Sequence, residues 1–260
     1  MTERLADIAP HALLGAGDPA PVEVINPDSD LPLVLVCEHA GQGIPARLGD
    51  LGLKPGEIDL HIGWDIGAEA VARRLADHLG APLVVQRYSR LVIDCNRPPE
   101  AADSIPPVSD RVPVPANAAL SAADRAARVA EIFTPFHAAV EQMVQAHPRR
   151  AAFAIHSFTP AMQGVARPWD IGFLFRNDTA TSERLAAQIA RMRPDWVIGM
   201  NQPYVVDDLS DFFVPRHGEA RGLAHSLIEI RNDHLRDADG QALWAAVLAE
   251  AITNVMGEIA

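Results

Sequence analysis

Three short apolar segments of this chain each end in a polar side chain that can bind a metal or carry a proton. Val36-Cys37 leads into Glu38-His39-Ala40-Gly41, Ala152–Ile155 leads into His156-Ser157-Phe158, and Ala224–Ile228 leads into Glu229-Ile230-Arg231. Apolar runs of this length are typical of strands that are buried on both faces of a sheet. In open α/β sheets, ligands bind at the carboxyl ends of such strands. The pattern therefore predicts a site of two histidines and a glutamate at one sheet edge, and it favours metal-dependent hydrolysis.

The remainder of the sequence alternates between strand and helix patterns. Strands are predicted at 31–37, 82–86, 90–94, 152–155, 170–175, 196–199, 204–206 and 225–230, and helices at 58–79, 122–145, 181–191 and 241–259. Pro135 predicts a kink in the second helix. Residues 1–30 are expected to form an N-terminal arm, and residues 100–119 a long surface loop. This alternation predicts a single α/β/α sandwich domain over residues 1–260.

The charge balance restricts the partners. Lys and Arg total 22 against 34 Asp and Glu, which gives a formal net charge of -12. Nucleic acids and anionic membranes need a basic surface, so neither is an expected partner. No apolar run is long enough to span a bilayer, and no signal-peptide pattern is visible at the start of the chain. Because the chain has only two cysteines, we expect a protein of the reducing cytoplasm. With nucleic acid and membrane not expected, a small molecule is the expected partner.

His39 and His156 are the predicted metal ligands. Zinc accepts imidazole nitrogen and carboxylate oxygen, and a catalytic zinc keeps three protein ligands and one open position. Asp65, in Gly63-Trp64-Asp65-Ile66-Gly67, is the preferred third ligand, and Glu38 and His61 are the alternatives. An aspartate at a helix start is also a common cap. The same ligand types accept manganese, iron or cobalt, so the native metal stays open.

A proton carrier and a carboxylate anchor complete the predicted site. Glu229 follows an apolar strand and is the candidate general base, although an ordinary surface pair with Arg231 would also explain it. Asn96 and Arg97 follow the run that ends at Asp94, where a guanidinium is well suited to bind a substrate carboxylate. Arg90 is a candidate for stabilising an oxyanion. Ser157, His217 and Arg231 are further candidates for substrate binding.

The ordered set of motifs resembles the N-formylglutamate amidohydrolase family. The matching segments are Val36–Gly41, Gly63–Gly67, Ser89–Pro98, Ile155–Pro160 and Leu227–Asp233, and the resemblance covers about residues 33–250. The family is distantly similar to zinc carboxypeptidases and aspartoacylase, which implies a mixed central sheet and one catalytic zinc. In those relatives an Asn-Arg pair holds the substrate carboxylate, which implies that role for Asn96 and Arg97. The resemblance likewise implies a base role for Glu229 and a carbonyl-polarising role for Arg90.

Two positions depart from the pattern of these relatives. The zinc enzymes take two ligands from a His-x-x-Glu motif, whereas the position three after His39 is Gln42. Typical formylglutamate hydrolases carry Pro-His-Ser-Gly where this chain has Glu38-His39-Ala40-Gly41. The second departure points to a side branch with a different substrate.

The leading hypothesis is a zinc-dependent amidohydrolase that cleaves an N-acyl amino acid, most simply N-formyl-L-glutamate. A second hypothesis is a carboxylate-binding protein without turnover, and a third makes Cys37 a nucleophile. Specificity for glutamate needs a second cationic contact, for which Arg87, Arg167, Arg216 and Arg231 are the candidates.

Overall fold

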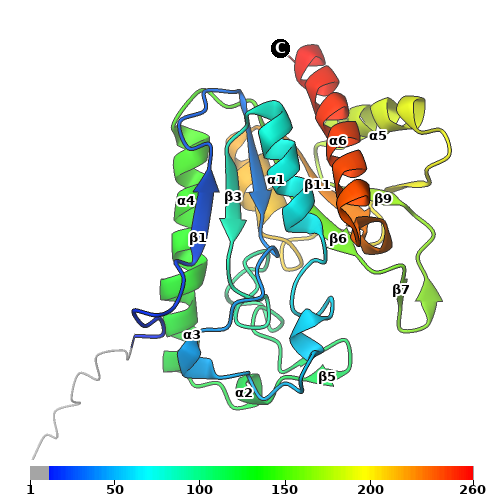
Figure 1. Ribbon diagram of the computed structural model, residues 1–260. Helices are drawn as coiled ribbons and strands as arrows, with labels where there is room; N and C mark the ends of the chain where they lie inside the picture. The colour runs from blue at the N-terminus through cyan, green and yellow to red at the C-terminus, as the bar shows by residue number, and fades with distance from the viewer. Residues whose placement is uncertain (1–11, 260) are drawn as a thin grey trace, which may run out of the picture.

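The computed structural model describes residues 12–259, and these contain a seven-stranded central sheet (Figure 1). The strands of this sheet are β1 (Val22–Ile25), β2 (Leu33–Cys37), β3 (Leu83–Gln86), β6 (Ala151–Phe158), β9 (Ile171–Leu174), β10 (Ile198–Met200) and β11 (Ala224–Arg231). Their order is β1-β3-β2-β6-β11-β9-β10. The four central strands run parallel, whereas β1 is antiparallel to β3, and β9 is antiparallel to β11. The sheet is therefore mixed, as expected.

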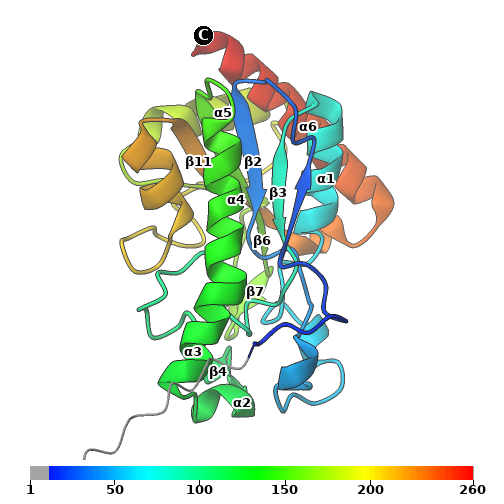
Figure 2. The same ribbon diagram turned by 90° about the vertical axis from the view of Figure 1, so that its left-hand side faces the viewer.

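Helices cover both faces of the sheet, which confirms the three-layer α/β/α prediction. The α-helices are α1 (Ala68–Leu79), α2 (Pro115–Ala118), α3 (Ala122–Arg128), α4 (Thr134–Gln145), α5 (Thr179–Met192) and α6 (Ala238–Glu258). Figure 2 shows α3 and α4 lying across one face, with α1 and α6 on the other. Short hairpins are formed by β4 (Val108–Ser109) with β5 (Val112–Pro113), and by β7 (Ala161–Met162) with β8 (Val165–Ala166).

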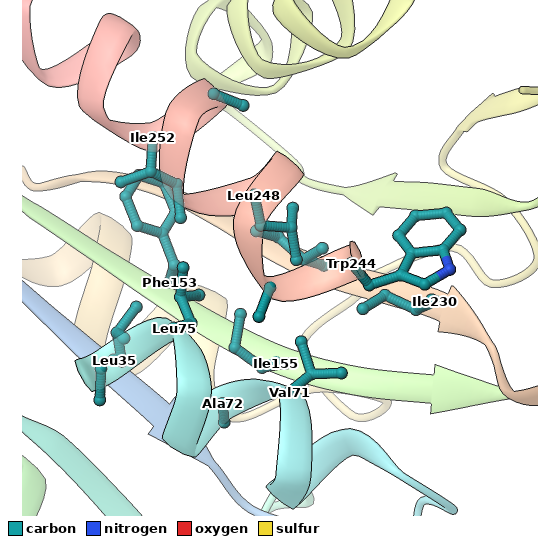
Figure 3. Packing of buried hydrophobic residues seen from close by; sticks show 14 of the residues in the cluster. Leu35, Val71, Ala72, Leu75, Phe153, Ile155, Ile230, Trp244, Leu248 and Ile252 are labelled. Carbon is teal, nitrogen blue, oxygen red and sulfur yellow. The ribbon is translucent and has the colours of Figure 1, made fainter. Parts of the chain in front are cut away.

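Alternate residues of the central strands are buried in two different cores. In β6, Phe153 and Ile155 pack with Leu75 of α1 and Leu248 of α6, as Figure 3 shows. Ala154 of the same strand faces the opposite core, which α3 and α4 cover. Burial on both faces explains why these strands read as continuous apolar runs in the sequence.

Several predicted elements differ from the structure at turns. The helix expected over 58–79 begins only at Ala68, because Gly67 adopts a left-handed conformation with φ 81° that ends the irregular segment before it. No strand forms at 204–206, which is irregular and leaves Val205 70% exposed. The helix expected over 122–145 contains a π-helical turn at Val129–Phe133, directly before Pro135. The kink expected at Pro135 stays a prediction.

The segment 90–94 is buried as expected, but it is not a strand. The backbone N–H of Arg90 donates to the Gly63 carbonyl, that of Val92 to Ser89, and that of Asp94 to Ser104. These bonds close turns instead of a ladder with a neighbouring strand, while Leu91 and Ile93 pack into the core beneath α4.

Two other predictions concern the ends of the chain and its loops. Part of the expected arm, residues 1–11, lies outside the described residues, and β1 within 12–30 pairs along β3 as an edge strand. The expected loop 100–119 contains the β4–β5 hairpin and α2.

Within residues 12–259, no helix combines the length and apolar character needed to cross a bilayer. Two 3-10 turns, Ala46–Leu48 and Glu57–Asp59, lie in the segment between β2 and α1.

Candidate metal centre and active site

The carboxyl ends of β2, β6 and β11 meet because these strands are adjacent and parallel. His156 pairs in register with Glu229, and both side chains belong to the sheet face of Ala154 and Leu227. His39 lies two residues beyond β2. The sheet thus brings together the three strand ends that the sequence singled out.

His39, Asp65 and His156 form a buried cluster whose candidate ligand atoms all lie within 4.8 Å of one another. The Nδ1 atom of His156 is 2.9 Å from Asp65 Oδ2 and 3.1 Å from His39 Nδ1. Two imidazole nitrogens and one carboxylate oxygen make up a donor set typical of a catalytic zinc ion. The cluster can therefore bind a divalent metal.

The backbone fixes Asp65 beside the histidines. Its N–H donates to the carbonyl of His39 at 2.9 Å, and its Oδ2 accepts from the backbone N–H of Ser157 at 3.2 Å. The Ser157 hydroxyl donates to the carbonyl of Ile66. These bonds join the loop between β2 and α1 to the end of β6, so Asp65 does not act as a side-chain helix cap here.

Two further buried carboxylates contact the Nε2 atoms of the two histidines. Glu38 Oε2 lies 2.9 Å from His156 Nε2, and Asp94 Oδ1 lies 2.6 Å from His39 Nε2. A carboxylate partner on one ring nitrogen fixes the tautomer and leaves the other nitrogen for a metal. Burial opposes a charge on His156, but the hydrogen bonds that its ring donates to Asp65 and Glu38 outweigh this effect and raise the pKa of the histidine. The surroundings thus favour positive charge at the cluster.

The alternative third ligands occupy other positions. Glu38 contacts His156 on the side of the ring away from Asp65. His61 lies 3.1 Å from Asp110 and is not part of the three-residue cluster.

Arg90 reaches the metal-binding cluster from the turn at 89–94. Its guanidinium contacts His39 and lies 3.4 Å from Asp65 Oδ1. Burial lowers the pKa of this arginine, and its buried Nε has no hydrogen-bond partner among residues 12–259. The group is placed to donate to an oxygen atom beside the cluster.

Glu229 has the properties of a proton carrier. Burial raises the pKa of its carboxyl to about 7, and its buried Oε2 has no hydrogen-bond partner within the described part of the chain. A carboxyl with a pKa near neutrality can both accept and return a proton.

Asn96 positions the segment Asp211–Phe213, which lies shortly before His217 in the sequence. Its Oδ1 accepts from the backbone N–H groups of Phe212 and Phe213, and its Nδ2 donates to Asp211 Oδ2 at 2.7 Å. Burial raises the pKa of Asp211 to about 7. Neighbouring Arg97 donates to the carbonyl of Ser210 and to Asp103. The Asn96-Arg97 pair therefore fastens the loop before β11.

These groups surround one pocket of about 460 Å³. Eight of the predicted site residues line it: His39, Asp65, Arg90, Asn96, Arg97, His156, Ser157 and Glu229. Tyr204, Val205 and Asp211 line it as well, although no motif in the sequence marked them.

Arg231, His217 and Cys37 are not brought into the pocket lining. Arg231 is 3.1 Å from Asp170 and 2.8 Å from Asp233. His217 is buried in the π-helical turn Val214–Gly218 and lies 2.9 Å from His137 of α4. Cys37 is fully buried in the core facing α1, and burial raises the pKa of its thiol, so it lacks the character of a nucleophile.

The fold is an α/β/α sandwich whose sheet edge carries a buried His-Asp-His cluster that could bind a metal, as in metal-dependent hydrolases. The family model for N-formylglutamate amidohydrolase matches residues 31–236, and the chain belongs to this family. It is accordingly a hydrolase that acts on amide bonds. Among curated proteins, none matches the chain.

Two solved structures are similar over nearly the whole chain. The gene product Atu2144 from Agrobacterium tumefaciens is 36% identical, with a TM-score of 0.90 over 95% of this chain and 99% of that one. An N-formylglutamate amidohydrolase from Ralstonia eutropha JMP134 is 21% identical, with a TM-score of 0.64 over 92% of this chain and 98% of that one. The second likeness shows a shared fold.

Proposed function

We propose that the protein hydrolyses N-acyl amino acids with a divalent metal, most simply zinc, held by His39, Asp65 and His156. The observation that carries this proposal is the buried three-residue cluster beside Glu229 in one pocket. N-formyl-L-glutamate is the first substrate to test, because the family is named for its hydrolysis.

The residues around the cluster divide the chemistry among them. A bound metal would polarise the amide carbonyl and lower the pKa of a water molecule toward neutrality. Glu229 accepts the proton of the attacking water and returns it to the departing amine nitrogen. Arg90 donates to the oxygen of the tetrahedral intermediate, as its position beside His39 and Asp65 suggests. Arg97 binds the substrate carboxylate.

Proton transfer by Glu229 is supported by its surroundings. The apolar strand and the core beneath it remove water from the carboxyl, which raises its pKa to about 7. At that value both protonation states are accessible near neutral pH, so one group can act as base and then as acid.

The proposal is tested by formate release from N-formyl-L-glutamate and from further N-formyl amino acids, with zinc-loaded and chelator-treated protein. We expect release only from the zinc-loaded protein, and loss of about a hundredfold or more in kcat for Glu229→Gln. Glu250→Gln is the matched control, because Glu250 is exposed on α6 and outside the pocket. Stoichiometric zinc without release from any substrate would indicate a binding protein instead.

A further inference from the structure

We propose that the pocket prefers N-acyl amino acids that carry one carboxylate and an apolar side chain over N-acyl glutamate. This inference rests on the proposed function, because it names the class of amino acid bound at the same site. It follows from the number of cations that the pocket offers and from the composition of its wall.

Only one guanidinium in the pocket lining is available for a substrate carboxylate. Arg90 and Arg97 are the arginines that line the pocket, which contains no lysine in its described lining. Arg90 contacts His39 and lies 3.4 Å from Asp65, so it belongs to the metal-binding end. Arg97 is held by the Ser210 carbonyl and by the exposed Asp103, and it would bind the α-carboxylate.

Two other arginines near the sheet edge are paired with carboxylates, and a third, Arg167, contacts a residue of the pocket wall. Arg87 is 2.6 Å from Glu69, and Arg231 is 3.1 Å from Asp170. Arg167 stacks 4.8 Å from the centre of the Tyr204 ring, and its Nη1 is 3.1 Å from the Tyr204 hydroxyl. Arg167 thus contacts a wall residue and does not itself belong to the pocket lining.

A second carboxylate would meet an unfavourable environment. Asp65, Asp211 and Glu229 line the same pocket as the two arginines. The γ-carboxylate of a glutamate would therefore lose water without gaining a cation from the pocket lining, beside the carboxyl groups of Asp211 and Glu229. An ion buried without a partner is strongly disfavoured.

An apolar side chain would instead find a matching surface. Met162 of β7, Leu174 of β9, Leu227 of β11 and the segment Pro203–Val206 supply the apolar part of the lining. The pocket volume of about 460 Å³ lies in the range that usually holds ligands larger than formylglutamate. Contact with these side chains favours a leucine- or methionine-like group.

The first experiment compares N-formyl derivatives of L-leucine, L-glutamine and L-glutamate with the zinc-loaded protein. Glutamine has the shape of glutamate without its charge, so it separates charge from apolarity. We expect kcat/KM to fall from leucine to glutamine to glutamate, by at least about tenfold between the first and the last. Equal or better use of formylglutamate would overturn the inference.

A variant adds the cation that the pocket lacks. Val205 lines the pocket and is 70% exposed, so lysine fits there without disturbing the core. We expect Val205→Lys to raise the glutamate-to-leucine ratio of kcat/KM roughly two- to fivefold, the effect of a partly exposed charge pair. Val165→Lys is the matched control, because Val165 is 69% exposed on β8 and outside the pocket lining. An equal shift in both variants would show that only net charge matters, and no shift in Val205→Lys would also contradict the inference.

The two proposals fail in different ways. If none of the three compounds is hydrolysed, the proposed function is wrong, and calorimetric binding of the same compounds to zinc-loaded protein still measures the preference. Tighter binding of the leucine derivative would support the inference in that case, whereas tighter binding of formylglutamate, or no binding of any, would refute it.

Discussion

Each histidine of the His39-Asp65-His156 cluster has a different partner on each of its two ring nitrogens. One ring nitrogen faces Asp65 and the other histidine, and the second contacts Glu38 or Asp94. The tautomer is thereby determined by a buried carboxylate, because Nε2 must carry the hydrogen that this carboxylate accepts. A metal bound at Nδ1 would have to displace the proton that the raised pKa of His156 favours in the metal-free protein.

Asp65 is the residue of the proposed metal site whose replacement should abolish metal binding. We expect Asp65→Asn to lose stoichiometric zinc, because a neutral amide replaces the only carboxylate of the cluster. Glu38→Gln removes a charge of the same sign from a residue that contacts His156 but not the metal position, and we expect about a ten- to hundredfold weaker zinc affinity. Competition with a chromophoric chelator measures both affinities. Equal losses in the two variants would contradict the assignment of Asp65 as a ligand.

The buried carboxyl of Glu229 should lower the stability of the metal-free protein near neutral pH. Its folded-state pKa of about 7 lies above the ordinary value of 4.5, so the folded protein binds more protons between these values. Stability is therefore lost as pH rises through this window, by up to about 3 kcal/mol for metal-free protein. We expect Glu229→Gln to be more stable than wild type at pH 8 but not at pH 4. Thermal unfolding of chelator-treated samples tests this; a variant advantage that is independent of pH would disagree.

The sequence marks site residues well where a strand determines their position. His156 and Glu229 are predictable because their runs are apolar and end together. The contact of Asp94 with His39 could not be predicted, because the apolar segment before Asp94 forms turns. The hydrogen-bond partners of this segment include Gly63 and Ser104, which lie outside it. Asp211 has no local signal, since its place depends on Asn96, 115 residues earlier.

At the scale of elements, β9 supports the strand that carries Glu229. Gly172 pairs with Glu229 in the antiparallel register, and a Cβ at position 172 would collide with the backbone carbonyl of Gln202. The close approach of these two backbone segments thus requires glycine.

Replacement of this glycine should disturb both stability and catalysis. We expect Gly172→Ala to cost about 1–3 kcal/mol, because backbone must move to make room, and to lower kcat through the shift of β11. Gly257→Ala is the matched control, since a Cβ there meets no atom within 4 Å at the end of α6. Denaturant unfolding and steady-state kinetics measure the two effects, and equal stability of the two variants would contradict this account.

The elements that the sequence predicts poorly are those defined by distant contacts. The helix periodicity over 58–79 continues through the turn at Gly67, whose left-handed backbone is not visible in an apolar pattern. The segment 204–206 has strand-like residues, but it serves as pocket wall instead of pairing with β10. Periodicity reports burial, whereas pairing depends on the position of a neighbour.

At the scale of the whole molecule, we propose that residues 12–259 form a single domain, because both cores pack against one sheet. The α/β/α architecture was predictable from the alternation of strand and helix patterns. Periodicity does not reveal strand direction, so the mixed sheet was expected only from the family resemblance, and the identity of the antiparallel strands was not predictable.

Metal binding should stabilise the entire domain. Asp65, Glu38 and Asp94 place three carboxylates around two histidines in the interior, and a cation would offset their mutual repulsion. At a zinc concentration a hundredfold above its Kd, we expect a gain of about 2.7 kcal/mol in the free energy of unfolding. A rise in Tm with zinc in wild type but not in Asp65→Asn would agree; an equal rise in both would place the binding elsewhere.

The cluster at the sheet edge and the wall segment held by Asn96 come from different parts of the fold. The metal-binding cluster lies on the strand ends and the Asp65 loop, whereas part of the opposite wall comes from the segment between β10 and β11, which Asn96 holds through the backbone of Phe212 and Phe213. Backbone donors are present whatever the side chains are. A side-chain substitution in this segment would therefore change the pocket wall and leave in place both the hydrogen bonds to Asn96 and the cluster at the sheet edge.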